Sequence, residues 1–189
     1  MTVSRLPPRR ALCLFCGASD KFPGSFNDAA AALGAGCAAN GWRLVYGGSR
    51  SGLMGRAARA AMAGGGEVVG IRPGGFLSAE MPAGEISEMI QVDTFFERKR
   101  LMATLSDHFV ALPGGLGTLD EVTDVMNLAV ARTHSKRTYL LDVDGYWQPL
   151  LRLFEHFDAF GATRPGFADS FAVVPDVAAL FALLGRAEA

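Results

Sequence analysis

Twice in this sequence, a short apolar run passes directly through a glycine-rich turn into a helical stretch. The two segments are RLVYGGSRSGLMG (43–55) and HFVALPGGLGTLDEV (108–122). Parallel strands need a crossover between them, usually a helix, so this arrangement is typical of a parallel sheet. Runs such as HFVAL and TYLLDV are apolar almost throughout, as expected for strands covered by helices on both faces. The sequence therefore predicts a doubly wound parallel α/β sheet.

The same alternation of strand and helix runs along the whole chain. The predicted strands are residues 11–16, 43–46, 67–71, 89–93, 108–112, 138–143 and 171–174. The predicted helices are residues 26–40, 53–63, 95–105, 118–132, 147–157 and 176–184. Gly41 follows the first helix, a position typical of a helix end. Ligands of such sheets bind beyond the carboxyl ends of the strands, so we expect the functional residues in the strand-to-helix turns.

Length and charge limit the classes of protein. The chain has 189 residues, 50% of them hydrophobic, and this favours one α/β domain (11–189) after a flexible N-terminal tail (1–10). A net charge of -1 gives no general attraction for a nucleic acid or an anionic membrane. No run reaches the about 18 apolar residues of a membrane span, and the apolar run after the basic opening is too short for a signal peptide. We expect a soluble, cytoplasmic protein with no nucleic-acid or membrane partner.

The cysteine pattern indicates packing residues rather than a metal site. Cys13 and Cys16 stand three apart in a predicted strand, so their side chains point to opposite faces. A zinc site needs further ligands at suitable spacing, and the histidines are scattered singly. We expect buried, reduced cysteines, as in a reducing cytoplasm, and neither a metal nor a cofactor. The three histidines are His108, His134 and His156.

The loop between the strand at 108–112 and the following helix predicts an anion site. Gly114, Gly115 and Gly117 allow a ligand to approach the backbone, and the helix start supplies free N–H groups and a positive dipole end. Thr118 and Glu121 also form the T-x-x-E pattern of a capping box. Capping of the helix and contact with a ligand both remain open for Glu121.

The earlier turn, YGGSRSG, has a similar composition. Beyond Gly47 and Gly48, Ser49 and Ser51 offer hydroxyl groups, and Arg50 offers a partner for phosphate. A tight strand-to-helix turn that uses its glycines only for packing remains the alternative. Neither loop continues into the Gly-Lys-Ser/Thr of a phosphate-binding P-loop. The later loop has two of the three glycines of the dinucleotide fingerprint, which disfavours a nicotinamide-dependent oxidoreductase.

A charged segment, ERKRLM (97–102), opens the helix predicted at 95–105. Arg98 and Arg100 lie on different helix faces, so only part of this segment could look into one site. A solvated helix face is the alternative. A guanidinium held beside an anion-binding loop could bind a phosphate or a sugar hydroxyl through two hydrogen bonds.

In order and spacing, YGGSRSGLMG (46–55), ERKRLM and PGGLGTLDE (113–121) resemble the Lonely Guy family of cytokinin-activating phosphoribohydrolases. The resemblance covers about residues 12–150. It implies a Rossmann-like fold, a homodimer with composite sites at its interface, and hydrolysis of cytokinin riboside 5'-monophosphates or AMP to free base and ribose 5-phosphate. Members of this family are often labelled lysine decarboxylases, but no lysine here stands in a recognisable setting for pyridoxal phosphate.

The resemblance also implies roles for particular residues. Arg98 and Glu121 match the catalytic arginine and glutamate of the family. An N-glycosidic bond breaks through an oxocarbenium-like sugar, so the carboxylate could stabilise positive charge and orient water, with Arg98 orienting the carboxylate or the sugar. The residues assigned to phosphate and substrate binding are Gly114, Gly115, Gly117, Thr118, Gly47, Gly48, Met54 and Lys99.

The chain departs from the family pattern in two places. Phe95 and Phe96 replace Met-His, and in the segment after the glycine loop Asn127-Leu128, Val130 and Arg137 replace Thr-Trp, Gln and Pro, with His134 and Lys136 retained. The identity of the base therefore stays open: adenine, N6-prenylated adenine, or another base. A nucleoside-monophosphate-sensing module without catalysis is the alternative function.

Overall fold

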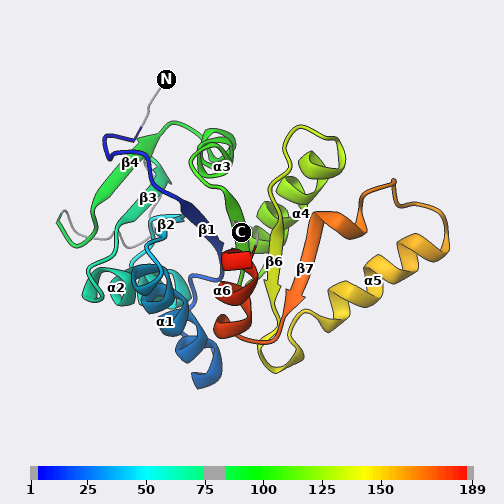
Figure 1. The fold of residues 1–189 in the computed structure, drawn as a ribbon, viewed down its shortest axis with the longest axis horizontal. Helices are drawn as coiled ribbons and strands as arrows, with labels where there is room; N and C mark the ends of the chain where they lie inside the picture. Colours follow the sequence, from blue (N-terminus) through cyan, green and yellow to red (C-terminus); the bar gives the residue numbers. More distant parts are fainter. Residues whose placement is uncertain (1–3, 75–83, 187–189) are drawn as a thin grey trace.

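Seven parallel strands form the central sheet of the protein (Figure 1). The computed structural model describes residues 4–74 and 84–186, so residues 1–3 of the expected tail and residues 75–83 and 187–189 of the expected domain lie outside the described residues. The strands are β1 (Ala11–Phe15), β2 (Arg43–Tyr46), β3 (Val68–Pro73), β4 (Glu88–Val92), β5 (His108–Ala111), β6 (Thr138–Leu141) and β7 (Phe171–Val174). Their order is β4-β3-β2-β1-β5-β6-β7. The chain starts at the centre and winds outward to both edges, which confirms the doubly wound sheet.

Six α-helices and two short 3-10 helices accompany these strands in the described residues. They are α1 (Gly24–Ala39), α2 (Gly52–Ala63), α3 (Phe95–Thr104), α4 (Leu116–Val130), η1 (Val143–Gly145), α5 (Gln148–Ala159), η2 (Ala168–Ser170) and α6 (Val177–Arg186). Every predicted strand and α-helix is present, and bounds differ by about two residues at most, within the normal uncertainty of helix ends. Gly41 has a φ of +71° just after α1, which confirms its place at the helix end.

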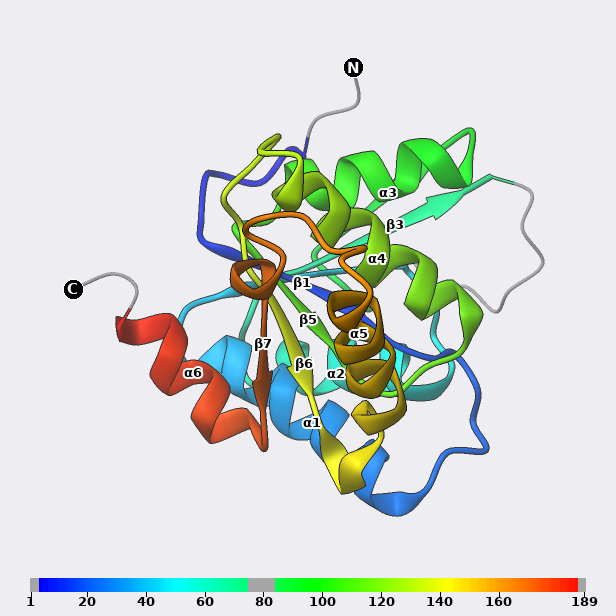
Figure 2. The same ribbon diagram turned by 90° about the vertical axis from the view of Figure 1, so that its right-hand side faces the viewer.

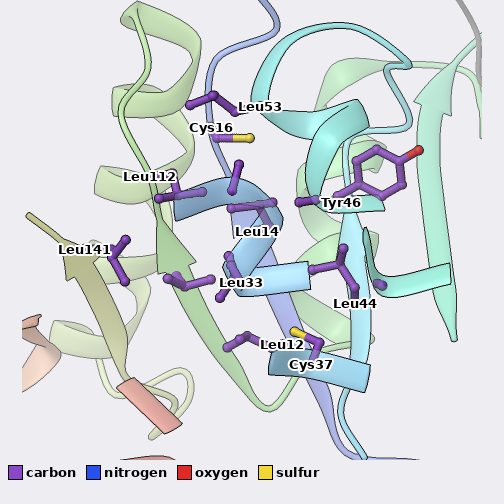
Figure 3. Packing of buried hydrophobic residues seen from close by; sticks show 14 of the residues in the cluster. Leu12, Leu14, Cys16, Leu33, Cys37, Leu44, Tyr46, Leu53, Leu112 and Leu141 are labelled. Atoms are coloured by element: carbon purple, nitrogen blue, oxygen red, sulfur yellow. The ribbon is translucent and has the colours of Figure 1, made fainter. Parts of the chain in front are cut away.

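The core consists of two layers of side chains, one on each face of the sheet. Helices α1, α2 and α6 cover one face, and α3, α4 and α5 cover the other (Figures 1 and 2). Successive residues of a strand point to opposite faces, so Leu12, Leu14 and Cys16 face α1 and α2 (Figure 3). Cys13 and Phe15 face the other layer. The cysteines are buried and free, as predicted.

The first described residues run beside strands β2 and β4. The Ser4 hydroxyl donates a hydrogen bond to Oε2 of Glu88 across 2.6 Å. Nη2 of Arg43 donates to the carbonyl oxygen of Pro7 across 2.6 Å. The part of the expected tail that the structure describes thus contacts the sheet.

The positions of β1 and β5 place the functional site. They pair at the centre of the sheet, and from them the chain winds in opposite directions. The loops that follow them therefore separate at the carboxyl edge, where such sheets form a ligand crevice. The N–H of Gly17, after β1, donates to the carbonyl oxygen of Pro113, after β5, across 3.0 Å. This hydrogen bond fixes the two loops side by side.

Candidate active site

A pocket of 320 Å³ lies at the meeting point of these loops. It joins the end of β1 to residues of α2, α3 and the first two turns of α4. Its lining residues are Cys16, Gly17, Ala18, Met54, Phe95, Arg98, Lys99, Gly115, Gly117, Thr118, Asp120 and Glu121. A larger hollow of 640 Å³ lies beside His134 and Asp169, but its carboxylate, Asp169, is exposed. The smaller pocket contains a buried carboxyl group, that of Glu121, which is 7% exposed.

The glycines of the loop after β5 have two different uses. A Cβ atom added to Gly115 or Gly117 would meet nothing within 4 Å, so both face open space. A Cβ on Gly114 would lie 2.1 Å from Oγ1 of Thr118 and 2.9 Å from the nitrogen of Gly17. Gly114 is therefore required by close packing. Gly115 and Gly117 leave the start of α4, with its free N–H groups, open to a ligand.

Glu121 does not take part in capping α4, so that alternative is wrong. The helix begins at Leu116 with Gly115 as its N-cap, and this places Thr118 inside the first turn. The pattern does form a cap at the start of α3, where the N–H of Glu97 donates to Oγ1 of Thr94 across 3.1 Å. Because α4 begins within the glycines, Glu121 lies in its second turn, where it faces the pocket.

Arg98 and Glu121 form a buried ion pair in the pocket. Nη2 of Arg98 donates to Oε1 of Glu121 across 2.6 Å, and the side chains are 11% and 8% exposed. The Arg98 guanidinium also lies over the ring of Phe95, with its Cζ 5.5 Å from the ring centroid. On another side, a Cβ on Gly47 would lie 2.4 Å from Nη2. The guanidinium is thus held between the carboxylate of Glu121, the ring of Phe95 and the backbone of Gly47. Arg100 is exposed, as expected from its different helix face.

The environment of Glu121 changes its acidity. Burial raises the pKa of Glu121 from 4.5 to about 7, although the positive charge of Arg98 lowers it and Asp120 raises it further. The energetic reason is that a carboxylate loses its hydration inside the protein. A carboxyl group that titrates near neutral pH can gain or lose a proton under physiological conditions, as acid and base groups of enzymes do.

Lys99 brings a second cation to the pocket. Its Nζ lies 3.1 Å from Oδ2 of Asp120 and 3.5 Å from Oδ2 of Asp124. Partial burial by itself lowers the pKa of Lys99, but these two carboxylates raise it above its ordinary value overall. Lys99 therefore stays protonated at the rim of the pocket.

The YGGSRSG turn reaches the pocket only in part. Met54 lines the pocket, and Gly47 lies behind Arg98. Gly48 has a φ of +78° and packs near Met89 and Arg72, outside the pocket lining. The turn therefore shapes the site mainly through its backbone.

The polar residues of this turn do not line the pocket. The hydroxyl of Ser49 accepts a hydrogen bond from the N–H of Ser51 across 3.2 Å, and Arg50 is exposed. The start of α2 is closed by protein groups, because the N–H of Gly52 donates to Oδ1 of Asp20 across 2.8 Å. This turn is not brought to the pocket as a second anion site.

The sequence did not predict two aromatic side chains that support the glycine loop and the strand before it. Oη of Tyr146 donates to the carbonyl oxygen of Gly114 across 2.5 Å, and Nε1 of Trp147 donates to the carbonyl oxygen of Ala111 across 3.2 Å. Both residues follow β6, the strand next to β5. Their position after a strand of the central sheet was the available signal, since no local motif marks them.

The departures after the glycine loop lie away from this pocket. Asn127 and Val130 line a separate hollow of 300 Å³ between α4 and α5. Nζ of Lys136 donates to the carbonyl oxygen of Ala103 across 2.7 Å. The N–H of Lys136 donates to Nδ1 of His134 across 3.2 Å. Of the two departures, only Phe95 lines the pocket itself.

Within the described residues, no helix combines the length and the apolar character that a membrane span requires. The described residues also contain no group of three or more His, Cys, Asp or Glu side chains that could hold a metal ion.

The sheet and the position of the pocket place the chain among doubly wound α/β proteins with a ligand pocket at the topological switch point. A family profile described as "Possible lysine decarboxylase" matches residues 54–184. A probable cytokinin riboside 5'-monophosphate phosphoribohydrolase of Oryza sativa subsp. japonica is 42% identical over 171 residues, which cover 90% of this chain and 75% of that protein. The chain belongs to the cytokinin riboside 5'-monophosphate phosphoribohydrolase family, and the resemblance is confirmed.

Other relatives agree with this family. The cytokinin riboside 5'-monophosphate phosphoribohydrolase of Rhodococcoides fascians is 37% identical over 172 residues, covering 90% of this chain and 87% of that protein. Across the curated relatives that it matches, the chain spans between 58% and 87% of their length. The molybdenum cofactor carrier protein of Chlamydomonas reinhardtii has a similar structure, with a TM-score of 0.72, 24% identity, and coverage of 95% of this chain and 98% of that chain. That likeness shows the fold alone.

Proposed function

We propose that this chain hydrolyses the N-glycosidic bond of a purine riboside 5'-monophosphate and releases the free base and ribose 5-phosphate. The observation that carries the proposal is the buried Arg98–Glu121 pair, which lies in the same pocket as the open start of α4. The names of the relatives, cytokinin riboside 5'-monophosphate phosphoribohydrolases, support the same reaction and the same class of substrate.

The start of α4 holds the 5'-phosphate in this proposal. The N–H groups at Gly115, Gly117 and Thr118 and the positive end of the helix dipole favour a doubly charged anion there. Lys99 adds a positive charge at the rim. Because Glu121 follows Gly117 by one turn on the same helix face, a phosphate at the helix start places the ribose beside the carboxylate.

Glu121 and Arg98 then act on the sugar. As the bond between C1' and the base breaks, its electron pair passes to the base, which takes up a proton, and the sugar becomes positively charged. The ionised carboxylate of Glu121 stabilises that charge and orients a water whose oxygen bonds to C1'. The proton that this water releases balances the proton taken up by the base, so the net reaction consumes one water. Arg98 keeps the carboxylate in place across 2.6 Å. A water molecule suits this role better than Cys16, because burial raises the pKa of that thiol and keeps it protonated.

We also propose a homodimer with its sites at the interface, acting in the cytoplasm on a small nucleotide rather than on nucleic acid or a membrane. Phe96 and Leu116, which neighbour pocket residues in sequence, are 74% and 82% exposed, and apolar side chains of this kind suit a partner subunit. The free cysteines fit a reducing compartment. Size-exclusion chromatography with light scattering tests the dimer, and cell fractionation tests the compartment.

The reaction itself is tested by incubating the purified protein with AMP, isopentenyladenosine monophosphate and CMP. Chromatography then measures free base and ribose 5-phosphate. Release of base from a purine nucleotide, lost in Glu121→Ala, supports the proposal and ranks the bases. Binding of these nucleotides without any release would instead identify a sensing module.

A further inference from the structure

The pocket presents its chemical groups in a defined sequence. Gly115 and Gly117 form the open helix start, and Glu121 lies one turn further along α4. Glu121 contacts Arg98, and Arg98 contacts the ring of Phe95. Each group lies one helical turn from the next or contacts it. The pocket therefore runs from an anion-binding helix start, through two charged groups, to an aromatic ring. A nucleoside monophosphate has the matching sequence of phosphate, sugar and flat base.

Phe95 is well placed for contact with a ligand. It is the first residue of α3, it lines the pocket, and it remains 46% exposed. A large apolar side chain at a helix start normally gains by burial, and this ring keeps nearly half of its surface accessible. The Arg98 guanidinium that lies over the ring is itself tied to Glu121, which restricts where the ring can lie.

We propose that Phe95 recognises the base of the nucleotide, with its ring forming the wall on which a purine stacks. This inference rests on the function proposed above and adds a specificity-determining residue to it. Stacking on an aromatic side chain selects for the size of the flat ring system rather than for its hydrogen-bonding groups. The nearby apolar lining of Met54 and Ala18 agrees with that kind of recognition. Purines are therefore preferred over pyrimidines.

The test compares Phe95→Leu and Phe95→Tyr with a matched control, Phe160→Leu. Phe160 follows α5, is 77% exposed and does not line the pocket. Two quantities are measured for each variant: KM for AMP, and the inhibition constant of ribose 5-phosphate, which lacks a base. Loss of the stacking contact between one base and one aromatic ring predicts that Phe95→Leu raises KM for AMP about tenfold. Ribose 5-phosphate should inhibit as before, Phe95→Tyr should behave as wild type, and Phe160→Leu should change neither quantity.

Other outcomes overturn the inference. Equal weakening of AMP and ribose 5-phosphate in Phe95→Leu would mean that the ring only supports Arg98. An unchanged KM would mean that the base lies elsewhere. Calorimetric titration with AMP and ribose 5-phosphate gives the same comparison without turnover. Loss of AMP binding in Phe95→Leu, in a protein that releases no base, would thus reject the proposed reaction while supporting the role of Phe95.

Discussion

Nη2 of Arg98 and Oε1 of Glu121 lie 2.6 Å apart, although their residues belong to different helices and are 23 positions apart in the sequence. Helix α3 leads into β5, and α4 leaves it, so the central strand brings the two helices to one pocket. The pair joins a permanent positive charge to a carboxyl group that titrates near neutral pH. This combination keeps a carboxylate available inside a pocket that would otherwise favour its neutral form.

Replacement of Glu121 by glutamine should abolish most of the activity while leaving the fold intact. The amide oxygen of glutamine can still accept the hydrogen bond from Arg98, but the negative charge is lost. Loss of one preorganised electrostatic group typically lowers kcat by about 100-fold to 1,000-fold. The rate of adenine release from AMP measures the effect, with circular dichroism as the check on folding. Glu155→Gln, at an exposed position on α5, is the matched control. A wild-type rate in Glu121→Gln would remove the carboxylate from the chemistry.

The activity should depend on pH through this carboxyl group. Burial raises the pKa of Glu121 to about 7, and the proposed reaction needs the ionised form. We therefore expect kcat/KM for AMP to rise as the pH increases through about 7 and then to level off. The residual activity of Glu121→Gln should lack this rise. The same rise in the variant would assign it to another group, such as the phosphate of the substrate.

The stability of the folded protein should change with pH in the opposite direction. Glu121 is protonated up to about pH 7 when folded but only up to about its ordinary 4.5 when unfolded. Between these values the folded state binds more protons, so this group lowers the free energy of unfolding as the pH rises. The full difference is at most about 3.5 kcal/mol, from about 1.4 kcal/mol for each pKa unit between 4.5 and about 7. Chemical denaturation at pH 5 and pH 8 should show a larger decrease for wild type than for Glu121→Gln. Equal decreases would mean that Glu121 titrates normally.

The fold was predictable because its signals are local. In β1, residues that alternate between faces, such as Leu12 and Cys13, are all buried, so the strand is apolar throughout. The glycine turns at Gly47 and Gly114 mark strand ends, and helices follow at once. Such features depend on neighbouring residues alone, and a single sequence contains them.

Local pattern did not decide the role of a residue within the site. The sequence has T-x-x-E at Thr94–Glu97 and again at Thr118–Glu121, and only the first is a helix cap. The difference comes from the backbone of Gly115, which has φ −93° and ψ −152° and starts α4 before Thr118. The second glutamate is thereby moved into the pocket. Contacts between residues far apart in the sequence, such as that of Tyr146 with Gly114, depend on the order of the strands in the sheet. No characteristic spacing in the sequence marks them.

Replacement of Gly47 by alanine should lower activity by displacing Arg98. The added Cβ would lie 2.4 Å from Nη2, and the end of a long side chain can move aside, so the protein should still fold. Moving the guanidinium breaks its contact with Glu121. A misplacement of about 1 Å in an active site can cost about 100-fold in rate. The kcat for AMP measures the effect, and Gly24→Ala, where a Cβ meets nothing within 4 Å, is the control. Unchanged kcat in Gly47→Ala would show that the exact position of Arg98 is unimportant.

Replacement of Tyr146 by phenylalanine should weaken phosphate binding without changing the chemical step. The hydroxyl donates to the carbonyl oxygen of Gly114, and the ring packs against Phe26 and Trp147, contacts that phenylalanine keeps. Without the hydrogen bond the glycine loop gains freedom that phosphate binding must remove. A net hydrogen-bond contribution of about 1 kcal/mol corresponds to about a fivefold increase in KM for AMP and in the inhibition constant of ribose 5-phosphate. Tyr139→Phe, a buried tyrosine outside the pocket, should change neither constant. If kcat fell while both constants stayed the same, Tyr146 would act on the reacting groups and not on the loop.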